Sequence, residues 1–436
     1  MPRSIVAQVE PRLLEWARRT SGYSIETAAR KVHVTAERLS AWESGAQTLS
    51  MAQLRRLADV YDRPLAVFYL ASPPKEPRAL RDFRHTAKGL QQPPSPDLIA
   101  EMRQARYRRA VALDVYDQLN DKPPRFTPRA DVDENPAAVA ARMREATGVA
   151  SIQNRHAVDA RSALASLRIS VEQLGVLVFQ MSDVEVKEAR GFSLAESSLP
   201  VIVLNAKDAV TARVFTLMHE LAHLMLHDGG ICDLGDTDVE VYCNAVAGNA
   251  LVPADLLRQA ITASGHRSGT SWNDDDLEDL AHHFSVSPEA IMRRLLDTGL
   301  TTQKAYQSKR DEYLKRSGDT AREKPRGAPS QPVLVLSRSG LSFTQLVLEG
   351  YHQDRLTLSD VADYLSVKLK HLPEIERQVT RRVLSLRSEV DLQYRYQFPA
   401  WCVGSSLSTR RHARFVEGNG APRTSQSNLR FNRSPQ

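Results

Sequence analysis

The sequence predicts a mainly α-helical protein with a small β-sheet, an α+β fold distributed over several domains. Three observations predict this class. The first 72 residues have the spacing of a bundle of short helices, residues 213–227 read as one long buried helix, and three short apolar runs precede that helix. The chain has 436 residues, and at about 150 residues per domain this length predicts two to four domains.

Changes in composition divide the chain into six predicted segments. They are a helical bundle at 1–72, a linker and helical connector at 73–135, a central domain with a helical subdomain at 136–300, a charged helix and linker at 301–335, a small helical module at 336–379, and a basic tail at 380–436 that we expect to be disordered. No internal repeat indicates a solenoid.

Composition restricts the compartment and the partners. No run approaches 18 uncharged apolar residues and no signal segment opens the chain, so we expect a cytoplasmic protein without membrane association. The three cysteines are irregularly spaced, which favours reduced thiols. Residues 1–90 carry a net charge of +6 and residues 380–436 carry +7, whereas the whole chain is only +6. Two basic ends permit contact with nucleic acid or an acidic partner.

The N-terminal segment predicts short helices separated by turn signals. Helices are expected at 11–20, 24–32, 35–43, 50–61 and 64–70, with a tight turn at His33-Val34. This pattern, and above all the ending Trp42-Glu43-Ser44-Gly45, resembles the helix-turn-helix of the Cro and phage-repressor class. Thr35 should cap the recognition helix, and a small core is expected from Ala28, Val32, Val34, Leu39 and Trp42.

The predicted recognition helix at 35–43 carries few side chains that could form hydrogen bonds with DNA bases. The resemblance places Thr35, Ala36, Glu37 and Ala41 toward the bases, with Arg38 able to touch phosphates. Alanine offers only a methyl group, and a glutamate accepts from cytosine while repelling phosphate. Sequence-specific DNA binding, weak backbone binding and protein docking therefore all remain open for this domain, with Thr35, Glu37 and Arg38 as the candidate DNA contacts.

Helices are next predicted at 97–121, 137–148 and 161–174, and they lead into the apolar runs 176–180, 191–195 and 201–205. These runs predict a small sheet beside the long helix. A strand at the border of a cleft could pair with an extended peptide backbone, which is how a peptidase would hold its substrate.

His219-Glu220-Leu221-Ala222-His223 is an H-E-x-x-H run within the long helix. Histidines four residues apart share one helix face and stand about 6 Å apart along the axis, so both can reach one metal ion at about 2.1 Å. Glu220 lies beside them, where it could take a proton from water and return it to a leaving amine. The alternative is two core histidines with Glu220 at the surface by chance.

A third ligand is expected from the helix predicted at 239–251. Glu240 follows His223 by 17 residues, which is enough for a chain reversal that returns a carboxylate to the metal. Cys243 lies one turn further along and competes as a thiolate, and Asp236 and Asp238 lie on the approach. His227 continues the histidine face but lies about 12 Å from His219, so we expect it to interact with the helix C-terminus instead.

These motifs together resemble the ImmA/IrrE family of zinc metallo-endopeptidases over about residues 150–300. The matching segments are Gly191-Phe192-Ser193, Pro200–Asn205, Arg213–His223, Glu240–Asn244 and Leu251-Val252-Pro253. The resemblance implies a zincin-like domain whose ligands are His219, His223 and Glu240. Cys243 and Val246 stand where the family usually has alanine and phenylalanine, and both departures concern the packing behind the ligand.

The chain therefore resembles a zinc endopeptidase fused to a repressor-type helix-turn-helix. We expect about one Zn²⁺ per chain on His219, His223 and Glu240, although Mn²⁺ and Fe²⁺ suit the same donors, and Glu220 as catalytic base and acid. The resemblance implies a protein substrate in gene regulation or stress response, such as a cognate helix-turn-helix repressor. The rival hypothesis is a DNA-binding regulator or antitoxin-like protein with a non-proteolytic zincin fold. The oxyanion donor and the oligomeric state are not assigned by the sequence.

Further helices are predicted downstream. Residues 277–296 have helix-turn-helix spacing, which we interpret as packing scaffold in preference to a second DNA reader. Residues 303–332 read as a helix followed by a linker. Residues 340–379 predict the small helical module, with Leu358–Ala362 and Leu365 as its core.

Overall fold

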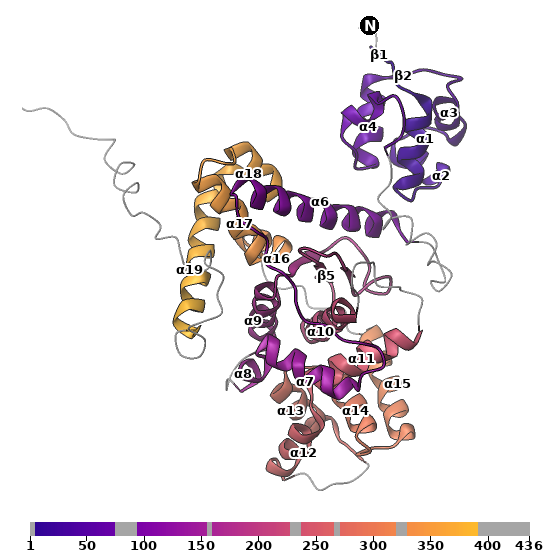
Figure 1. Cartoon of the computed structure of the whole chain (residues 1–436). Coiled ribbons are helices and arrows are strands. Elements are labelled where there is room, and N and C mark those ends of the chain that lie inside the picture. The colour runs from indigo at the N-terminus through magenta and orange to yellow at the C-terminus, as the bar shows by residue number, and fades with distance from the viewer. Residues whose placement is uncertain are drawn as a thin grey trace, which may run out of the picture. The chain divides into compact units, whose positions relative to one another are not determined.

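A computed structural model describes residues 5–74, 94–154, 159–226, 237–265, 271–319 and 329–390. The chain divides into one unit at 1–384 and a second at 385–436. The predicted α+β class is confirmed, because helices dominate the described residues and strands form only two small sheets (Figure 1). No helix among the described residues combines the length and the apolar character needed to cross a membrane.

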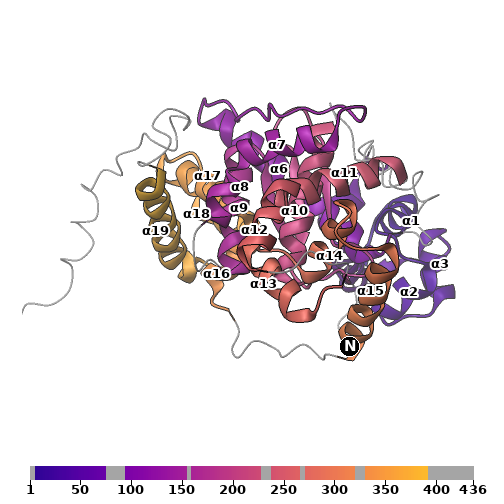
Figure 2. The same cartoon turned by 90° about the horizontal axis from the view of Figure 1, so that it is seen from below.

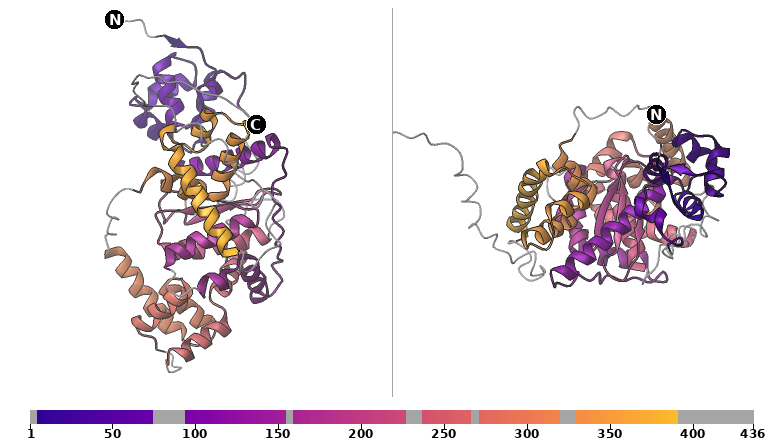
Figure 3. Two further views of the ribbon diagram at one scale, coloured as in Figure 1. Left: turned by 90° about the vertical axis from the view of Figure 1, so that its left-hand side faces the viewer. Right: turned by 90° about the horizontal axis from the view of Figure 1, so that it is seen from above.

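The N-terminal domain is a bundle of short helices, drawn in indigo in both views of Figure 3. Its elements are β1 (Val6–Ala7), α1 (Pro11–Thr20), α2 (Ile25–Lys31), α3 (Ala36–Glu43), β2 (Leu49–Ser50), α4 (Met51–Val60) and the 3₁₀ helix η1 (Leu65–Tyr69). The two short strands pair antiparallel. Its core includes Ala28, Val32, Leu39 and Trp42, with Val34 packed against it as a partly buried neighbour, which confirms the predicted set.

Hydroxyl caps explain where these helices begin. The side chains of Ser24, Thr35 and Ser50 each accept a hydrogen bond from a backbone N–H in the first turn of the helix that follows. This satisfies a donor that the helix itself leaves unpaired. The turn between α2 and α3 is made at His33, whose φ of 60° is the left-handed conformation that reverses the chain within a few residues. The predicted cap at Thr35 is therefore confirmed.

The central region begins with a long helix and three shorter ones. They are α6 (Pro96–Gln118), α7 (Pro136–Thr147), α8 (Val149–Gln153) and α9 (Ala160–Gln173). Gly148 has a φ of 62° and serves both as the end of α7 and as the start of α8, so the two helices follow each other without a loop.

A three-stranded sheet supports the long helix that carries the H-E-x-x-H run. Its strands are β3 (Leu177–Met181), β4 (Gly191–Leu194) and β5 (Val201–Asn205), in the order β3-β5-β4. β3 runs parallel to β5 with Leu177 opposite Val201, and β4 runs antiparallel with Gly191 opposite Leu204. All five residues of β3 and of β5 are buried, as expected for strands covered on both faces. β4 is left as an edge strand.

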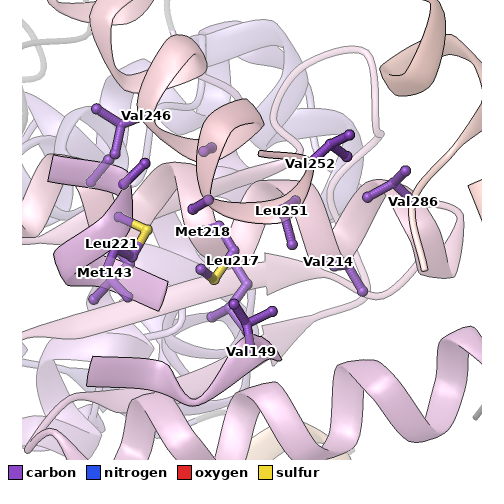
Figure 4. Packing of buried hydrophobic residues seen from close by; sticks show 14 of the residues in the cluster. Met143, Val149, Val214, Leu217, Met218, Leu221, Val246, Leu251, Val252 and Val286 are labelled. Carbon is purple, nitrogen blue, oxygen red and sulfur yellow. The ribbon is translucent and has the colours of Figure 1, made fainter. Parts of the chain in front are cut away.

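Two long helices follow the sheet: the first packs on β4 and β5, and the second packs on the first and on α7, as Figure 2 shows. They are α10 (Val210–Leu226) and α11 (Thr237–Leu251). Figure 4 shows Leu217, Met218 and Leu221 of α10 among the side chains of the main core. Because α10 is apolar on most sides, it is held by core packing, and its few polar side chains are constrained by that packing.

Four further helices complete this region: α12 (Ala254–Ala263), α13 (Asp274–Phe284), α14 (Pro288–Asp297) and α15 (Gln303–Asp319). The pair α13 and α14 corresponds to the helix-turn-helix spacing in the sequence, with Ser285 in the left-handed conformation between them. Leu277, Phe284, Ile291 and Leu295 from this pair are buried in the main core. This packing agrees with the interpretation of the pair as scaffold.

The C-terminal helices are α16 (Gln331–Ser339), α17 (Leu341–His352), α18 (Leu358–Tyr364), the 3₁₀ helix η2 (Leu369–His371) and α19 (Leu372–Val390). Three expectations need correction. Residues 331–335 are helical instead of linker, because Pro332 lies in the first turn of a helix, where proline is tolerated. Leu358 is 43% exposed, so Val361 and Leu365 are the buried side chains of the predicted set. The helix α19 continues to Val390, beyond the predicted start of a disordered tail.

Candidate metal centre

The two histidines of the H-E-x-x-H run lie on one face of α10. Their Nε2 atoms are 3.0 Å apart, and the rings meet edge to face with centroids 4.7 Å apart. His223 is 2% exposed and Glu220 is 8% exposed. Burying a polar side chain this deeply costs free energy unless it forms hydrogen bonds. The hydrogen-bond partners of these side chains therefore define the site.

The helix α11 brings a carboxylate to both rings. Oε1 of Glu240 lies 3.1 Å from Nε2 of His223, and Oε2 lies 3.3 Å from Nε2 of His219. One ligand atom from each of the three residues falls within 4.8 Å of the others, and no second such group of three occurs in the part of the chain that the structure describes. The three residues could therefore hold one metal ion.

The electrostatics of the cluster agree with its geometry. Hydrogen bonds from His219 and His223 hold the pKa of the Glu240 carboxyl far below its usual range, against a smaller effect of burial. Burial lowers the pKa of His219, but Glu240 and Glu220 outweigh it and the net shift is upward. A carboxylate and two imidazoles make an N, N, O donor set, which suits Zn²⁺ and leaves a fourth position for water or substrate.

The competing ligands have different positions. Cys243 is fully buried in the main core, away from the three ligand atoms. Asp238 is exposed and does not belong to the cluster. Asp236 and His227 lie outside the described residues. Glu240 and Cys243 are three residues apart, about one helical turn, so helical spacing alone would place them on one face of α11. In the structure their surroundings differ: Glu240 and Asn244 border the cleft, whereas Cys243 and Ala247 are buried in the core.

Glu220 is held by a residue that the sequence did not assign. Oγ of Ser193 donates a 2.8 Å hydrogen bond to Oε2 of Glu220, and both groups are buried. Ser193 lies on β4, so the edge strand and α10 must approach closely at this point. Gly191 permits the approach, because a Cβ at that position would lie 2.6 Å from Cγ2 of Thr216 and 2.8 Å from the carbonyl oxygen of Val203.

A cleft of about 330 Å³ opens onto this cluster. Its lining includes residues 188–193, so β4 forms one wall, and Phe215 stacks on the His219 ring with centroids 6.3 Å apart. A larger groove of about 890 Å³ shares Phe215, Thr216 and Asn244 with this cleft and continues along α11 and α14. The cleft therefore extends into a groove long enough to accept more than a single residue of a substrate.

The candidate DNA contacts lie on the first turn of α3. Thr35 accepts a 3.3 Å hydrogen bond from the backbone N–H of Arg38, and Thr35, Glu37 and Arg38 are all exposed. The guanidinium of Arg38 lies over the Trp42 ring, 5.5 Å from its centroid. The backbone N–H of Glu37, with the hydroxyl of Thr35, keeps the pKa of the Glu37 carboxyl below its usual range. An ionised carboxylate thus stays on the face expected to meet DNA.

Ser193 is the functional candidate that sequence reasoning missed. It precedes Glu220 by 27 residues and belongs to a different element, so no periodicity links the two. The segment Gly191-Phe192-Ser193 did contribute to the family resemblance. The signal that would have identified it is a polar residue inside an apolar strand that packs against α10.

The fold and the cluster define a domain of the metallopeptidase type. Residues 171–296 match the family model for M78 peptidases, described as the IrrE N-terminal-like domain, and residues 14–68 match a helix-turn-helix model. These matches confirm both resemblances, that of the central domain to the M78 peptidases and that of the N-terminal segment to the helix-turn-helix domains. A search of curated proteins found no match.

Proposed function

We propose that this chain is a zinc-dependent endopeptidase that cleaves a protein substrate. The observation that carries the proposal is the convergence of His219, His223 and Glu240 beside a buried, hydrogen-bonded Glu220. His219, His223 and Glu240 would hold the ion. Zinc bound there would supply Lewis acidity, which lowers the pKa of a water molecule toward about 7 and polarises the carbonyl group that is attacked.

The protein's own residues account for the proton transfers. Glu220 accepts a proton from the attacking water and later delivers it to the leaving amine, so one carboxylate acts as base and then as acid. The hydrogen bond from Ser193 orients this carboxylate by restraining Oε2, and Oε1 remains for the proton. The low exposure of Glu220 excludes bulk water from the transfer.

The substrate would bind as an extended strand. β4 is the edge of its sheet in the described structure and borders the cleft, so its backbone can pair with a substrate backbone across the candidate metal centre. The groove along α11 and α14 would receive the side chains on one side of the scissile bond. These features support a polypeptide as substrate.

The helix-turn-helix domain supports a substrate in gene regulation, and we propose a cognate helix-turn-helix repressor in the cytoplasm. The exposed recognition turn carries Glu37, and the net +6 charge of residues 1–90 favours only weak, electrostatic DNA contact. The domain would therefore serve chiefly to bring the peptidase to its partner. A DNA-binding regulator without proteolysis is the alternative, and the buried Glu220–Ser193 pair argues against it, because a purely structural zinc site has no use for such a base.

The decisive experiment uses the variant Glu220→Gln. The zinc-loaded protein is incubated with helix-turn-helix repressors encoded nearby, and discrete products are identified by mass spectrometry. Wild type should cleave, whereas Glu220→Gln should lose at least about 10²–10⁴-fold in rate while it keeps its zinc, because it removes the base without removing a ligand. Glu185→Gln, an exposed carboxylate paired with Lys207, is the matched control and should cleave normally. Cleavage by Glu220→Gln at the wild-type rate would exclude this mechanism.

A further inference from the structure

The groove of about 890 Å³ beside the candidate metal centre follows one face of α11. Val241, Asn244, Ala245, Gly248 and Val252 line it, and their spacing is that of residues on one side of a helix. From Val241 to Val252 this face is about 16 Å long, at about 1.5 Å per residue. An extended peptide rises by about 3.3 Å per residue, so the groove can hold about five substrate residues.

The end of the groove nearest the candidate metal centre is apolar. Val241 directly follows Glu240 in α11 and is 60% exposed. Phe215 and Ala245 line the groove with it. A substrate side chain that covers this surface would remove apolar area from water, which favours an apolar residue next to the scissile bond.

The groove carries more arginines than carboxylates. The arginines of its lining are Arg190, Arg258, Arg293, Arg294 and Arg310, and the carboxylates are Glu289 and Asp297. Four of the arginines have carboxylate partners: Arg190 lies 3.3 Å from Asp208, Arg293 and Arg294 share Asp297 at 3.0 and 3.3 Å, and Arg310 lies 3.6 Å from Glu289. Two guanidinium groups on one carboxylate leave this wall positive even after the pairs are counted.

Arg258 is the remaining arginine of the lining. It lies on α12, one turn after Ala254, which also borders the groove, and it is exposed. Its guanidinium has no hydrogen bond or ion pair with any residue that the structure describes. Asp255, one turn earlier, lies outside the lining, and its charge acts on Arg144. Arg258 therefore offers an unpaired positive charge beyond the Val252 end of α11.

We propose that the groove selects substrates that carry an apolar side chain next to the scissile bond and an acidic side chain about five residues away, bound by Arg258. This inference rests on the proposed endopeptidase function and specifies its substrate. Because Arg258 is exposed, the ion pair should change affinity by at most about fivefold. The charge would act chiefly by selecting among sequences, since a basic side chain at the same position would be repelled.

The test measures peptide selection by the full-length, zinc-loaded Glu220→Gln protein, which should hold peptides without cutting them. A mixture of random dodecapeptides is passed over the immobilised protein, and the retained peptides are sequenced by mass spectrometry. They should be enriched in Asp or Glu about five positions from an apolar residue. The enrichment should decline as salt is raised, because exposed charges are screened.

Variants of α12 in the same Glu220→Gln background identify the residue responsible. Arg258→Gln should lose the acidic enrichment and bind the best-retained peptide about three- to fivefold more weakly. Arg258→Glu should reverse the preference toward Lys and Arg. Gln259→Glu is the matched control, because it changes the net charge as much as Arg258→Gln does, at an exposed neighbour outside the groove lining. It should select peptides as its parent does.

The proposal fails if no peptide is retained, if the retained peptides are not enriched in acidic residues, or if Arg258→Gln and Gln259→Glu select alike. Incubating the same mixture with wild type separates this result from the proposed function. Cleavage without acidic selection would contradict the role of Arg258 alone. Acidic selection without any cleavage would contradict the endopeptidase function and leave the groove as a site that binds acidic peptides.

Discussion

The candidate metal centre and the recognition turn of α3 use polar side chains in opposite ways. In the metal centre, polar groups from α10, α11 and β4 are largely buried and converge on one point, and hydrogen bonds connect most of them. On α3, Thr35, Glu37 and Arg38 are exposed and belong to a single helical turn. Buried side chains that converge on one point are held in fixed positions by the core, so their arrangement indicates which reaction the site could support. Exposed side chains that point away from one another define only a surface for contact with a partner.

This comparison predicts its largest effect at Glu240, the proposed third ligand. Glu240→Ala should weaken zinc binding by more than about 100-fold, because partners outside the ligand set alone contribute about 10–100-fold in metal sites. Zinc per chain is measured by elemental analysis after dialysis, and wild type should retain about one ion. Cys243→Ala is the matched change one turn away and should keep its zinc. The opposite pattern, with zinc lost only in Cys243→Ala, would assign the third ligand to the thiol.

A smaller effect is expected from removing the hydrogen bond between Ser193 and Glu220, the proposed base. Ser193→Ala should lower kcat by about tenfold, the size of one charge-assisted hydrogen bond of about 1.4 kcal/mol, with KM and zinc content unchanged. Ser193→Thr restores a hydroxyl and should recover part of the rate. An unchanged kcat in Ser193→Ala would show that core packing alone orients Glu220.

Removing the N-terminal bundle should affect recognition more than chemistry. Deletion of residues 1–72 should reduce cleavage of a full-length repressor several-fold, because an additional docking contact raises the local concentration of substrate. Cleavage of a short peptide that spans the scissile bond should be nearly unchanged. Equal loss on both substrates would indicate that the bundle supports the peptidase fold instead.

The smallest effect concerns DNA. Binding should be weak and fall steeply with salt, and it should discriminate little between sequences, because Ala36, Glu37 and Ala41 cannot make the bidentate base contacts worth about 1–3 kcal/mol each. Fluorescence anisotropy against several duplexes at increasing salt measures this. A footprint on one defined operator that persists at about 200 mM salt would show that the bundle reads DNA directly.

Local sequence patterns predicted the parts of the site that depend on one helix. His219, Glu220 and His223 follow from helical periodicity alone, and the cap at Thr35 follows from a hydroxyl at a helix start. The prediction of Glu240 as a ligand also needed a second predicted helix and the family resemblance. Ser193 could not be predicted in its role, because its contact with Glu220 depends on how close β4 approaches α10, and that distance is set by tertiary packing.

The errors in the fold have similar causes. Leu358 reads as core by its apolar character, yet it occupies the first position of α18, where the side chain reaches solvent. The segment 331–335 reads as a linker because Ser330 and Pro332 suggest a turn, but serine before a helix and proline in its first turn are also typical of helix starts. The orientation of Cys243 away from the metal centre likewise depends on the packing of α11 against the core, which helical spacing alone does not define.

The single free edge of β4 has a consequence for the choice of substrate. A chain that pairs with this strand must present several consecutive residues in extended form, and a folded repressor helix does not offer them. The target segment would have to open before it is cut, so the cleavage rate should follow the free energy of local opening in the target. Substitutions that loosen the repressor near its scissile bond would then hasten its destruction even though they touch no part of the peptidase.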